Sequence, residues 1–291
     1  MIVVIGGTGT LGREIVKRLV AAGQRVRVLT RAQNRARGLP DGVELTVGDL
    51  RSPATLSMAV RGCDAVVSAA HGFVGPGNPS PDAIDREGNR ALVAAAAAAQ
   101  VVHFVLVSVH GASPQHPMSL ARAKYAAEEH LRASGVPFTI VRATPFIETW
   151  LSIMGDMLVK KGQVTVFGPG TNPVNFVSAH DVAAAVASAL TTATPANETL
   201  DISGPDNVGL AQLARQLLQT KGVNAPVKHI PLVALRALSL LARPFAPAFA
   251  RQAQAAVLMN TTDMSVASAV TTNAPRRGIP YTSISDVLAR A

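Results

Sequence analysis

The sequence predicts an α/β fold: a doubly wound parallel sheet, with a smaller, mostly helical region toward the C-terminus. Short apolar runs alternate with helical patterns through the first half of the chain, which is typical of parallel strands joined by crossover helices. The chain has 291 residues and 48% hydrophobic content, so it can also bury a large core.

The predicted strands are short and apolar, as strands buried on both faces of a sheet should be. They lie at residues 2–6, 25–30, 43–47, 64–69, 102–108 and 136–142. Helical periodicity falls between them, at residues 11–22, 53–60, 82–99 and 118–134. The alanine run at 94–99 continues the third of these helices, because alanine is the strongest helix former. Past residue 142 the alternation ends.

A glycine cluster follows the first predicted strand directly and opens the first helix. It consists of Gly6, Gly7, Thr8, Gly9, Thr10, Leu11 and Gly12, and it satisfies both the G-x-G-x-x-G and the G-x-x-G-x-x-G spacing. Glycines let the chain turn sharply and let a pyrophosphate approach the N–H groups at a helix start. Strand, glycines and helix in this order predict a dinucleotide site in a Rossmann sheet, whereas the alternative is that the glycines serve packing alone.

Basic residues follow the second predicted strand. The strand ends at Arg31, about where such a site places the residue facing the adenosine ribose, and Arg35 comes shortly after. No acid occurs between Arg31 and Asp41. A guanidinium can bind a 2′-phosphate through two parallel hydrogen bonds, so NADP(H) is favoured over NAD(H) as the cofactor. The alternative is an ordinary solvated basic loop.

The formal net charge of +9 is partly explained by this predicted site, because residues 1–61 hold ten Lys/Arg and four Asp/Glu. No zinc-finger spacing or RNA-binding aromatic motif occurs, and aromatic residues make up 4%, so we expect no nucleic-acid partner. The single cysteine, Cys63, excludes internal disulfides and cysteine-rich metal sites. We expect no metal and a small-molecule substrate.

The chain begins almost directly with a predicted strand, which leaves no room for a signal peptide and favours a cytoplasmic protein. The apolar segment 231–259 is interrupted by three arginines and two prolines. It therefore predicts a pair of amphipathic helices and not a membrane span, and no membrane partner is expected.

Several motifs together resemble the NmrA-like group of atypical short-chain dehydrogenase/reductases. They are the glycine cluster, Arg31, Gly48-Asp49-Leu50, the helix segment 123–128, the segment 134–142 and the segment 177–183, and the resemblance covers most of residues 1–205. It implies that Asp49, beside Leu50, lies near the adenine, that Ala69 and Ala70 line the cofactor groove, and that Lys124 lies near the nicotinamide ribose. We expect an NADP-binding Rossmann domain at 1–142, to which 177–190 returns, and a substrate-binding region at 143–176 and 191–291.

The expected catalytic residues depart from the broader family. The usual tyrosine lies four residues before the lysine, on the same helix face, and here that position is Leu120. Lys124 can still orient the cofactor or stabilise developing negative charge, and its alternative is a solvated ion pair with Glu128. His110 is a candidate proton donor and substrate contact, and Ser108, two residues earlier, is a candidate to hydrogen-bond the substrate or cofactor. The alternative for His110 is an ordinary packed or exposed histidine, and the alternative for Ser108 is a serine that only hydrogen-bonds local backbone groups.

The segment after residue 142 supplies the candidate substrate contacts. Large apolar side chains recur near helical spacing and in the Gly/Pro-rich stretch that follows, at Phe146, Trp150, Met154 and Phe167. They suit an apolar ligand, or they form ordinary core. Ser178 and Asp181 fit the start of a helix and are expected to cap it.

The sequence thus predicts an NADPH-dependent reductase acting on a small or medium, largely apolar carbonyl, quinone or activated alkene. Two alternatives stay open. One is a non-enzymatic NADP(H)-sensing regulator, which the missing tyrosine would suit. The other is cofactor-independent use of the apolar cavity.

Overall fold

The chain forms two compact units in the computed structural model, which describes residues 1–73, 80–191, 197–267, 279 and 281–290. The first unit comprises Met1–Ala143 and Ala179–Ile202, with Ile279. The second comprises Thr144–Ser178 and the described residues from Ser203 onward, apart from Ile279.

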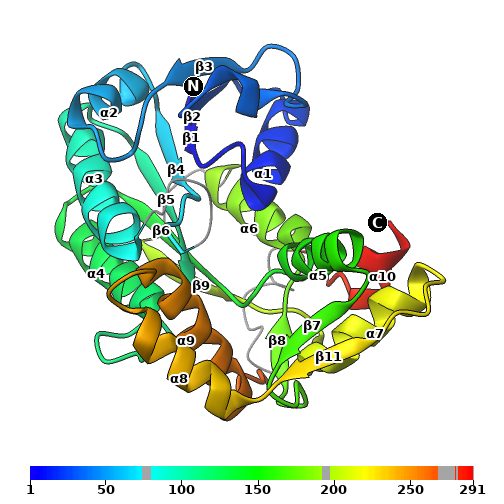
Figure 1. Cartoon of the computed structure of the whole chain (residues 1–291). Helices are drawn as coiled ribbons and strands as arrows, with labels where there is room; N and C mark the ends of the chain where they lie inside the picture. Colours follow the sequence, from blue (N-terminus) through cyan, green and yellow to red (C-terminus); the bar gives the residue numbers. More distant parts are fainter. Residues whose placement is uncertain (74–79, 192–196, 268–278, 280, 291) are drawn as a thin grey trace. The chain divides into compact units, whose positions relative to one another are not determined.

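A seven-stranded parallel sheet forms the centre of the first unit (Figure 1). Its strands are β1 (Ile2–Ile5), β2 (Val26–Thr30), β3 (Glu44–Val47), β4 (Ala65–Ser68), β5 (His103–Val109), β6 (Phe138–Ala143) and β9 (Glu198–Ile202). The order across the sheet is β3-β2-β1-β4-β5-β6-β9, so the connections change direction between β1 and β4. Ligands of doubly wound sheets bind at the carboxyl ends of the strands at such a switch point. The six predicted strands are confirmed, whereas β9 was not predicted.

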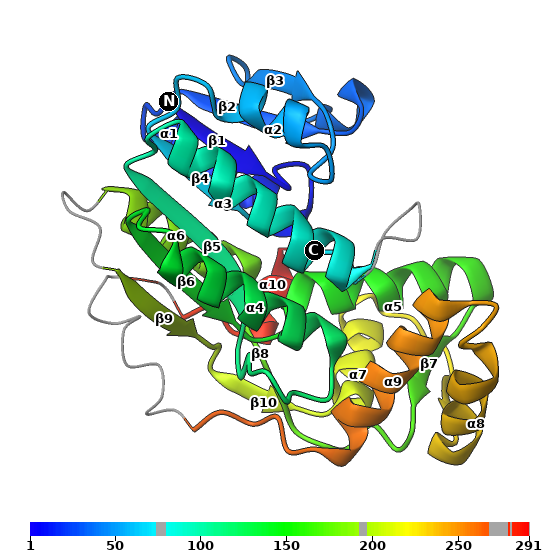
Figure 2. The same ribbon diagram turned by 90° about the vertical axis from the view of Figure 1, so that its left-hand side faces the viewer.

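Helices cover both faces of this sheet (Figures 1 and 2). One face carries α2 (Pro53–Val60), α3 (Asn89–Ala98) and α4 (Ser119–Ala133), and the other carries α1 (Thr10–Ala21) and α6 (Ala179–Thr191). A π-helical segment, Asp82–Gly88, runs directly into α3, and a short 3₁₀ turn, Gln33–Ala36, follows β2. The doubly wound prediction is confirmed.

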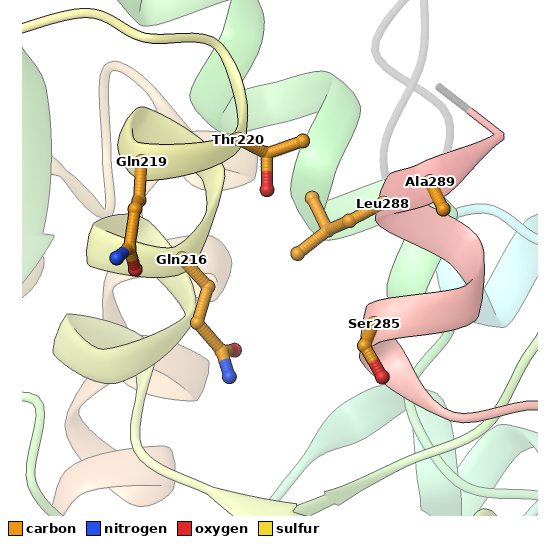
Figure 3. Close-up of a pocket in the computed structure, with 6 residues that line it drawn as sticks. All are labelled: Gln216, Gln219, Thr220, Ser285, Leu288 and Ala289. Atoms are coloured by element: carbon orange, nitrogen blue, oxygen red, sulfur yellow. The ribbon is translucent and has the colours of Figure 1, made fainter.

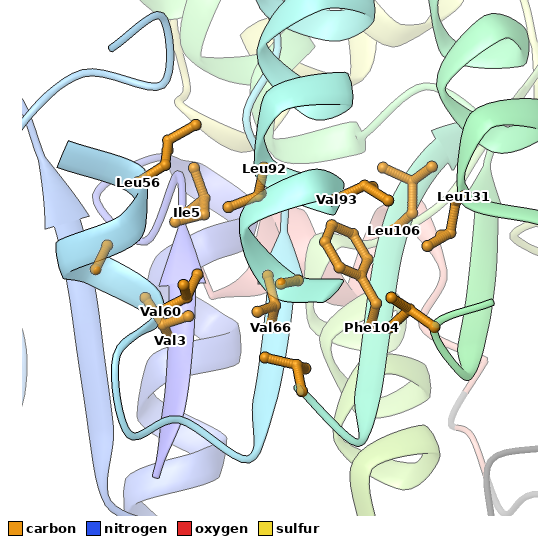
Figure 4. Packing of buried hydrophobic residues seen from close by; sticks show 14 of the residues in the cluster. Val3, Ile5, Leu56, Val60, Val66, Leu92, Val93, Phe104, Leu106 and Leu131 are labelled. Atoms are coloured by element: carbon orange, nitrogen blue, oxygen red, sulfur yellow. The ribbon is translucent and has the colours of Figure 1, made fainter. Parts of the chain in front are cut away.

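The core under α2, α3 and α4 is continuous and apolar (Figure 4). Val3 and Ile5 of β1 and Val66 of β4 point toward the helices, where they meet Leu56 and Leu92. The inner strands are buried on both faces, which explains why they consist of short apolar runs and not of alternating patterns. This packing fixes the ends of β1 and β4, from which the loops of the candidate site emerge.

Strand β9 places part of the later chain in the first unit. It pairs in parallel with β6, with Arg142 opposite Asp201. The return to the first unit therefore begins at Ala179 and reaches Ile202, whereas the sequence analysis ended it at residue 190 and assigned 191–291 to the substrate region. Helix α6 begins directly after Ser178, whose hydroxyl donates to Glu148 Oε1 at 2.6 Å, and Asp181 lies in its first turn.

The second unit combines helices with two small sheets. Its helices are α5 (Ile147–Lys161), α7 (Leu210–Thr220), α8 (Leu232–Ala242), α9 (Pro247–Thr261) and α10 (Ile284–Ala289). Strands β7 (Val164–Phe167) and β11 (Val227–Ile230) pair in parallel, and β8 (Val174–Phe176) and β10 (Asp206–Val208) pair antiparallel. Helices α8 and α9 confirm that this segment forms a pair of helices, but α8 is apolar nearly all round and is not amphipathic as predicted. Within the described ranges, no helix has both the length and the apolar content that crossing a membrane requires.

Candidate cofactor and active site

The glycine loop after β1 is packed against the loop after β4. Gly6 has a φ of +84°, and a Cβ added there would lie 2.7 Å from the Ala70 nitrogen and 2.8 Å from the Ala69 carbonyl carbon. A Cβ on Gly12 would lie 2.0 Å from the Gly6 oxygen. Because these neighbours are backbone atoms, the fold itself requires glycine at both positions. The same contacts bring Ala69 and Ala70, both half-buried, beside the loop.

Gly9 differs from these two glycines. Its φ of −83° and ψ of 175° are extended backbone that any residue adopts, and the nearest atom to an added Cβ is the Gly6 oxygen, at 3.4 Å. Gly9 is the N-cap of α1, whose first turn contains no acidic residue. The first N–H groups of a helix lack intrahelical partners and attract anions. The open backbone at Gly9 therefore fits a pyrophosphate.

Arg13 connects the glycine loop to the basic segment after β2. Its Nε donates to the Thr8 carbonyl at 3.2 Å, its Nη2 to the Arg35 carbonyl at 2.7 Å and its Nη1 to the Arg37 carbonyl at 2.7 Å. Arg31 is exposed at the start of the same segment. A single guanidinium thus holds the two loops that the sequence assigned to the pyrophosphate and the 2′-phosphate.

Of the two residues predicted to lie near the adenine, Asp49 makes polar contacts and Leu50 is packed in the core. Asp49 accepts from Arg51 Nε at 2.9 Å and from Arg51 Nη2 at 2.7 Å. These bonds hold the pKa of the Asp49 carboxyl below its usual value, and the charge of Arg31 lowers it further. Leu50 is buried in the core beside Gly88. Asp49 therefore offers acceptor oxygens at the end of β3, while Leu50 supports the loop.

Lys124 is a buried lysine of α4 whose ammonium reaches the loop that follows β4. Its Nζ donates to the Ala70 carbonyl at 3.0 Å and forms an ion pair with Asp85 Oδ1, also at 3.0 Å. Both side chains are buried. The alternative of a solvated pair with Glu128 is wrong. Asp85 Oδ2 accepts from the Gly72 N–H at 2.8 Å, whereas the contact of Oδ1 with Lys124 lacks the angle of a hydrogen bond.

Asp85 and Asn89 are site residues that the sequence analysis missed. The Asn89 side chain donates to the Asp85 carbonyl at 2.8 Å and accepts from Ser68 Oγ at 2.6 Å. Asp85 lies in the π-helical segment, a type of distortion that is frequent at functional sites. The sequence offered only a weak signal: Asp85 and Asn89 are four residues apart and share one face of the predicted helix, but other charged residues surround them.

Ser108 is held in a buried polar network on the α4 side of the sheet. Its hydroxyl donates to Glu128 Oε1 at 2.5 Å, and Glu128 also accepts from Arg142 Nε at 3.0 Å and Nη2 at 2.6 Å. Glu128 is fully buried, and this contact raises the pKa of the Arg142 guanidinium. The Ser108 proton is thus directed to a carboxylate.

His110 is paired with an acid from the strand that was not predicted. Its Nδ1 lies 3.0 Å from Asp201 Oδ1 of β9, and both side chains are about 38% exposed. Because β9 lies two strands beyond β5, this contact directs the ring toward β9 and away from β4. The carboxylate orients the imidazole, as a proton donor requires, but in a direction away from Lys124.

Apart from His110, the candidate substrate residues lie in the second unit. Met154 is buried in its core, Trp150 packs edge to face on Phe176 with ring centroids 6.4 Å apart, and Phe146 is half-buried. Trp150, Met154 and Phe167 line one apolar cavity of about 30 Å³. A cavity of this size holds about one water. Within this unit these side chains therefore form core around a small void.

A larger pocket of about 280 Å³ lies between α7 and α10 (Figure 3). Gln216 and Leu288 point into it, and none of the predicted site residues lines it. Its lining is made of amide, hydroxyl and aliphatic groups without a charged side chain.

The first unit thus has the architecture of a dinucleotide-binding protein: an open glycine loop at a switch point, a basic segment after β2, and a buried lysine of α4 at the loop after β4. The comparisons agree. Residues 6–193, more than half of the chain, match a family model described as NAD(P)H-binding. The chain belongs to this NAD(P)H-binding family, and its expected place among the atypical short-chain dehydrogenase/reductases is confirmed.

Individual relatives support the same assignment. The chain is 32% identical over 234 residues to the NAD(P)H azoreductase of Xenophilus azovorans, covering 80% of this chain and 77% of that protein. It is 29% identical over 243 residues to the photosystem II assembly factor Ycf39 of Trieres chinensis, covering 82% and 74%. The Citrobacter sp. triphenylmethane reductase complexed with NADP(H) shares the fold, with a TM-score of 0.78 at 21% identity over the full length of both chains.

Proposed function

We propose that the protein is an NADPH-dependent reductase that transfers hydride to a small or medium, largely apolar carbonyl, quinone or activated alkene. The observation that carries this proposal is the buried Lys124–Asp85 pair at the Ala70 carbonyl, directly beside the glycine loop. Burying an ammonium group in this place costs free energy, so stability alone is a poor reason for it to be there. Catalytic sites commonly contain such buried charged groups.

The cofactor would be held by backbone and basic groups of the first unit. The N–H groups at the start of α1, approached across Gly9, would bind the pyrophosphate. Arg31 and Arg35 would face the 2′-phosphate, and Asp49 would accept from the adenine side. The bound nicotinamide supplies the hydride.

Lys124 would orient the nicotinamide ribose and stabilise negative charge that develops on the substrate. Asp85 holds the ammonium in one position, because the pair is buried and Asp85 is itself fixed by Gly72. Asp85 is therefore a positioning residue in this proposal. Ser108 has no part in the chemistry, since its proton is directed to Glu128.

The proton that follows the hydride has two candidate donors. His110 is oriented by Asp201, as described above. His71 follows Ala70 directly, and its Nδ1 accepts from the Phe73 N–H at 3.3 Å. Nε2 therefore carries the hydrogen of the neutral ring, and His71 can act as an acid only after a second proton replaces the bond at Nδ1. His71 also lies within electrostatic reach of Asp85 and Lys124. A His71→Asn variant and a His110→Asn variant separate the two, because loss of the true donor lowers turnover by about 10²-fold or more and alters its pH profile.

The test is NADPH oxidation, followed at the nicotinamide absorbance band, with a panel of quinones, enones and ketones. The azoreductase relative makes an azo dye a rational addition. Removing only the lysine would leave a buried carboxylate unpaired, at a cost of about 3–5 kcal/mol in stability. We therefore pair Lys124→Met with Asp85→Asn, and expect the double variant to bind NADPH but to turn over about 10²-fold more slowly.

The matched control carries the same two substitutions on an exposed ion pair of α5, Lys160→Met with Asp156→Asn, where Nζ and Oδ2 are 3.2 Å apart. It should behave as the parent protein. Unchanged turnover in the Lys124/Asp85 variant would show that the buried pair serves structure alone.

A second candidate function is a non-enzymatic NADP(H)-sensing protein. Leu120 in the usual tyrosine position and the identity to a photosystem assembly factor both favour it. This candidate predicts saturable NADPH binding with no oxidation by any member of the panel, and a partner interaction that changes with cofactor redox state. Single-turnover absorbance on the parent protein distinguishes the two functions.

A further inference from the structure

The helix pair α8–α9 exposes an unusual number of large apolar side chains. Six of them form what we call the outer face: Val233, Leu238, Leu240, Leu241, Phe245 and Phe249. The most exposed are Phe245, at 90%, Val233, at 77%, and Leu241, at 75%. Figures 1 and 2 both show α8 and α9 side by side, so the six residues belong to one helical hairpin.

The pattern on α8 is the reverse of that on an ordinary surface helix. Its buried positions are Leu235 and Ser239, which face a small cluster with Ala253 and Ala256 of α9. The serine hydroxyl donates to the Arg236 carbonyl of its own helix at 2.8 Å, while neighbouring leucines are exposed. A helix that is apolar nearly all round is normally buried on all sides. Helix α9 covers only one side of α8.

The charges within the chain segment that forms this hairpin have a single sign. Residues 207–262 contain six Lys/Arg and no Asp/Glu, a large share of the net +9 of the chain. Arg236 and Arg243 are exposed on the hairpin itself. A second copy of the chain on this face would bring like charges together with no carboxylate to pair them, whereas a surface of phosphates would attract them.

We propose that the outer face binds the surface of an anionic lipid bilayer. Leu241 and Phe245, at the turn between the helices, would enter the boundary of headgroups and acyl chains. Arg236 and Arg243 would remain at the lipid phosphates. This is a peripheral contact and not a spanning helix, and it departs from the expectation of the sequence analysis that the protein has no membrane partner. It does not depend on the proposed reductase activity.

The experiment is flotation of the full chain with phosphatidylcholine vesicles, with and without phosphatidylglycerol. We expect binding to the mixed vesicles, weaker binding to phosphatidylcholine alone, and a decrease as salt is raised. Leu241→Ser with Phe245→Ser should lower the partition coefficient at least about tenfold, because two exposed apolar side chains lose their contact with lipid. Both positions are exposed, so the variant should melt as the parent protein does.

Val159→Ser is the matched control, since Val159 of α5 is an equally exposed apolar residue of the same unit, at 86%, outside the hairpin. It should bind vesicles as the parent protein does. Absence of binding to the mixed vesicles at low salt, or equal binding by the double variant, would overturn the proposal. Sedimentation that shows a dimer abolished by the same double variant would also overturn it, and would assign the face to a second copy.

Discussion

Replacing Gly9 by alanine separates a ligand role of the glycine loop from a packing role. The backbone at Gly9 is in the extended region, and an added Cβ meets no atom closer than 3.4 Å. Alanine is a poorer N-cap than glycine by roughly 0.5–1 kcal/mol, and the lower entropy of the unfolded chain offsets about the same amount. The free energy of unfolding of Gly9→Ala should therefore stay within about 1 kcal/mol of the parent value.

The affinity for NADPH should change far more. A methyl group at this position lies where the pyrophosphate would approach the start of α1, and it would displace one charge-assisted hydrogen bond or more. Each such bond contributes about 1.5–3 kcal/mol, which corresponds to about a ten- to hundredfold weaker Kd. Titration calorimetry gives the Kd, and thermal unfolding followed by circular dichroism gives the stability.

Gly12→Ala is the contrasting variant. Its Cβ would lie 2.0 Å from the Gly6 oxygen and 2.7 Å from the Gly7 Cα, so backbone must move. Overpacking of this kind costs about 1–3 kcal/mol or more, and about 1 kcal/mol corresponds to a Tm lower by roughly 2–4 °C in a chain of this size. If Gly9→Ala binds NADPH as tightly as the parent protein, or melts as early as Gly12→Ala, the assignment of Gly9 to the pyrophosphate is refuted.

Three further variants test the cofactor site and the pH response. Arg31→Asp should narrow or invert a preference for NADPH over NADH by about ten- to hundredfold in the ratio of Kd values, and equal affinities in the parent protein would contradict the assignment. Arg13→Gln should loosen the segment after β2 and weaken NADPH binding about tenfold more than NADH binding. The control Lys17→Gln, on the exposed side of α1, should change neither the NADPH affinity nor the NADH affinity. If Arg13→Gln weakens the binding of both cofactors equally, the arginine affects stability only. Burial lowers the pKa of His103, so the unfolded chain takes up a proton that the folded protein does not, and stability should fall as the pH drops below about 6.5. Glutamine at position 103 keeps a hydrogen-bond partner for Thr139. In urea unfolding, the free energy of unfolding of His103→Gln should therefore depend less on pH below about 6.5 than that of the parent protein. Identical pH profiles for the two proteins would show that His103 is not the cause.

The sequence predicted those elements and site residues that are recognisable from a pattern of neighbouring residues. The six predicted strands are short runs that are either apolar throughout or alternate, and the glycine loop and Arg31 each directly follow one of these strands, so they could be predicted. Strand β9 could not, because it lies at the sheet edge, is only partly buried and follows an excursion through the second unit.

Partners distant in sequence were beyond the same reasoning. Lys124 was recognised from its helix segment, but its partner Asp85 lies in another element, and the nearer Glu128 was the only pairing that helical spacing suggested. Asp201, the partner of His110, lies on the strand that was missed. A local pattern identifies which side chains can act, whereas tertiary packing decides the direction in which each one points.

The place of β9 in the chain also sets the order in which the first unit can be completed during synthesis. When Ala143 has left the ribosome, six of the seven strands exist, and β6 has a free edge of N–H and C=O groups. The chain then continues through Thr144–Ser178 of the second unit and through α6 before β9 emerges. Free strand edges pair readily with other chains. In the complete sheet this edge is formed by β9, which is only partly buried, whereas before Ile202 is released it is formed by the almost fully buried β6. A chain shortened to the end of α6 would keep the more apolar edge and should aggregate more readily than the full chain.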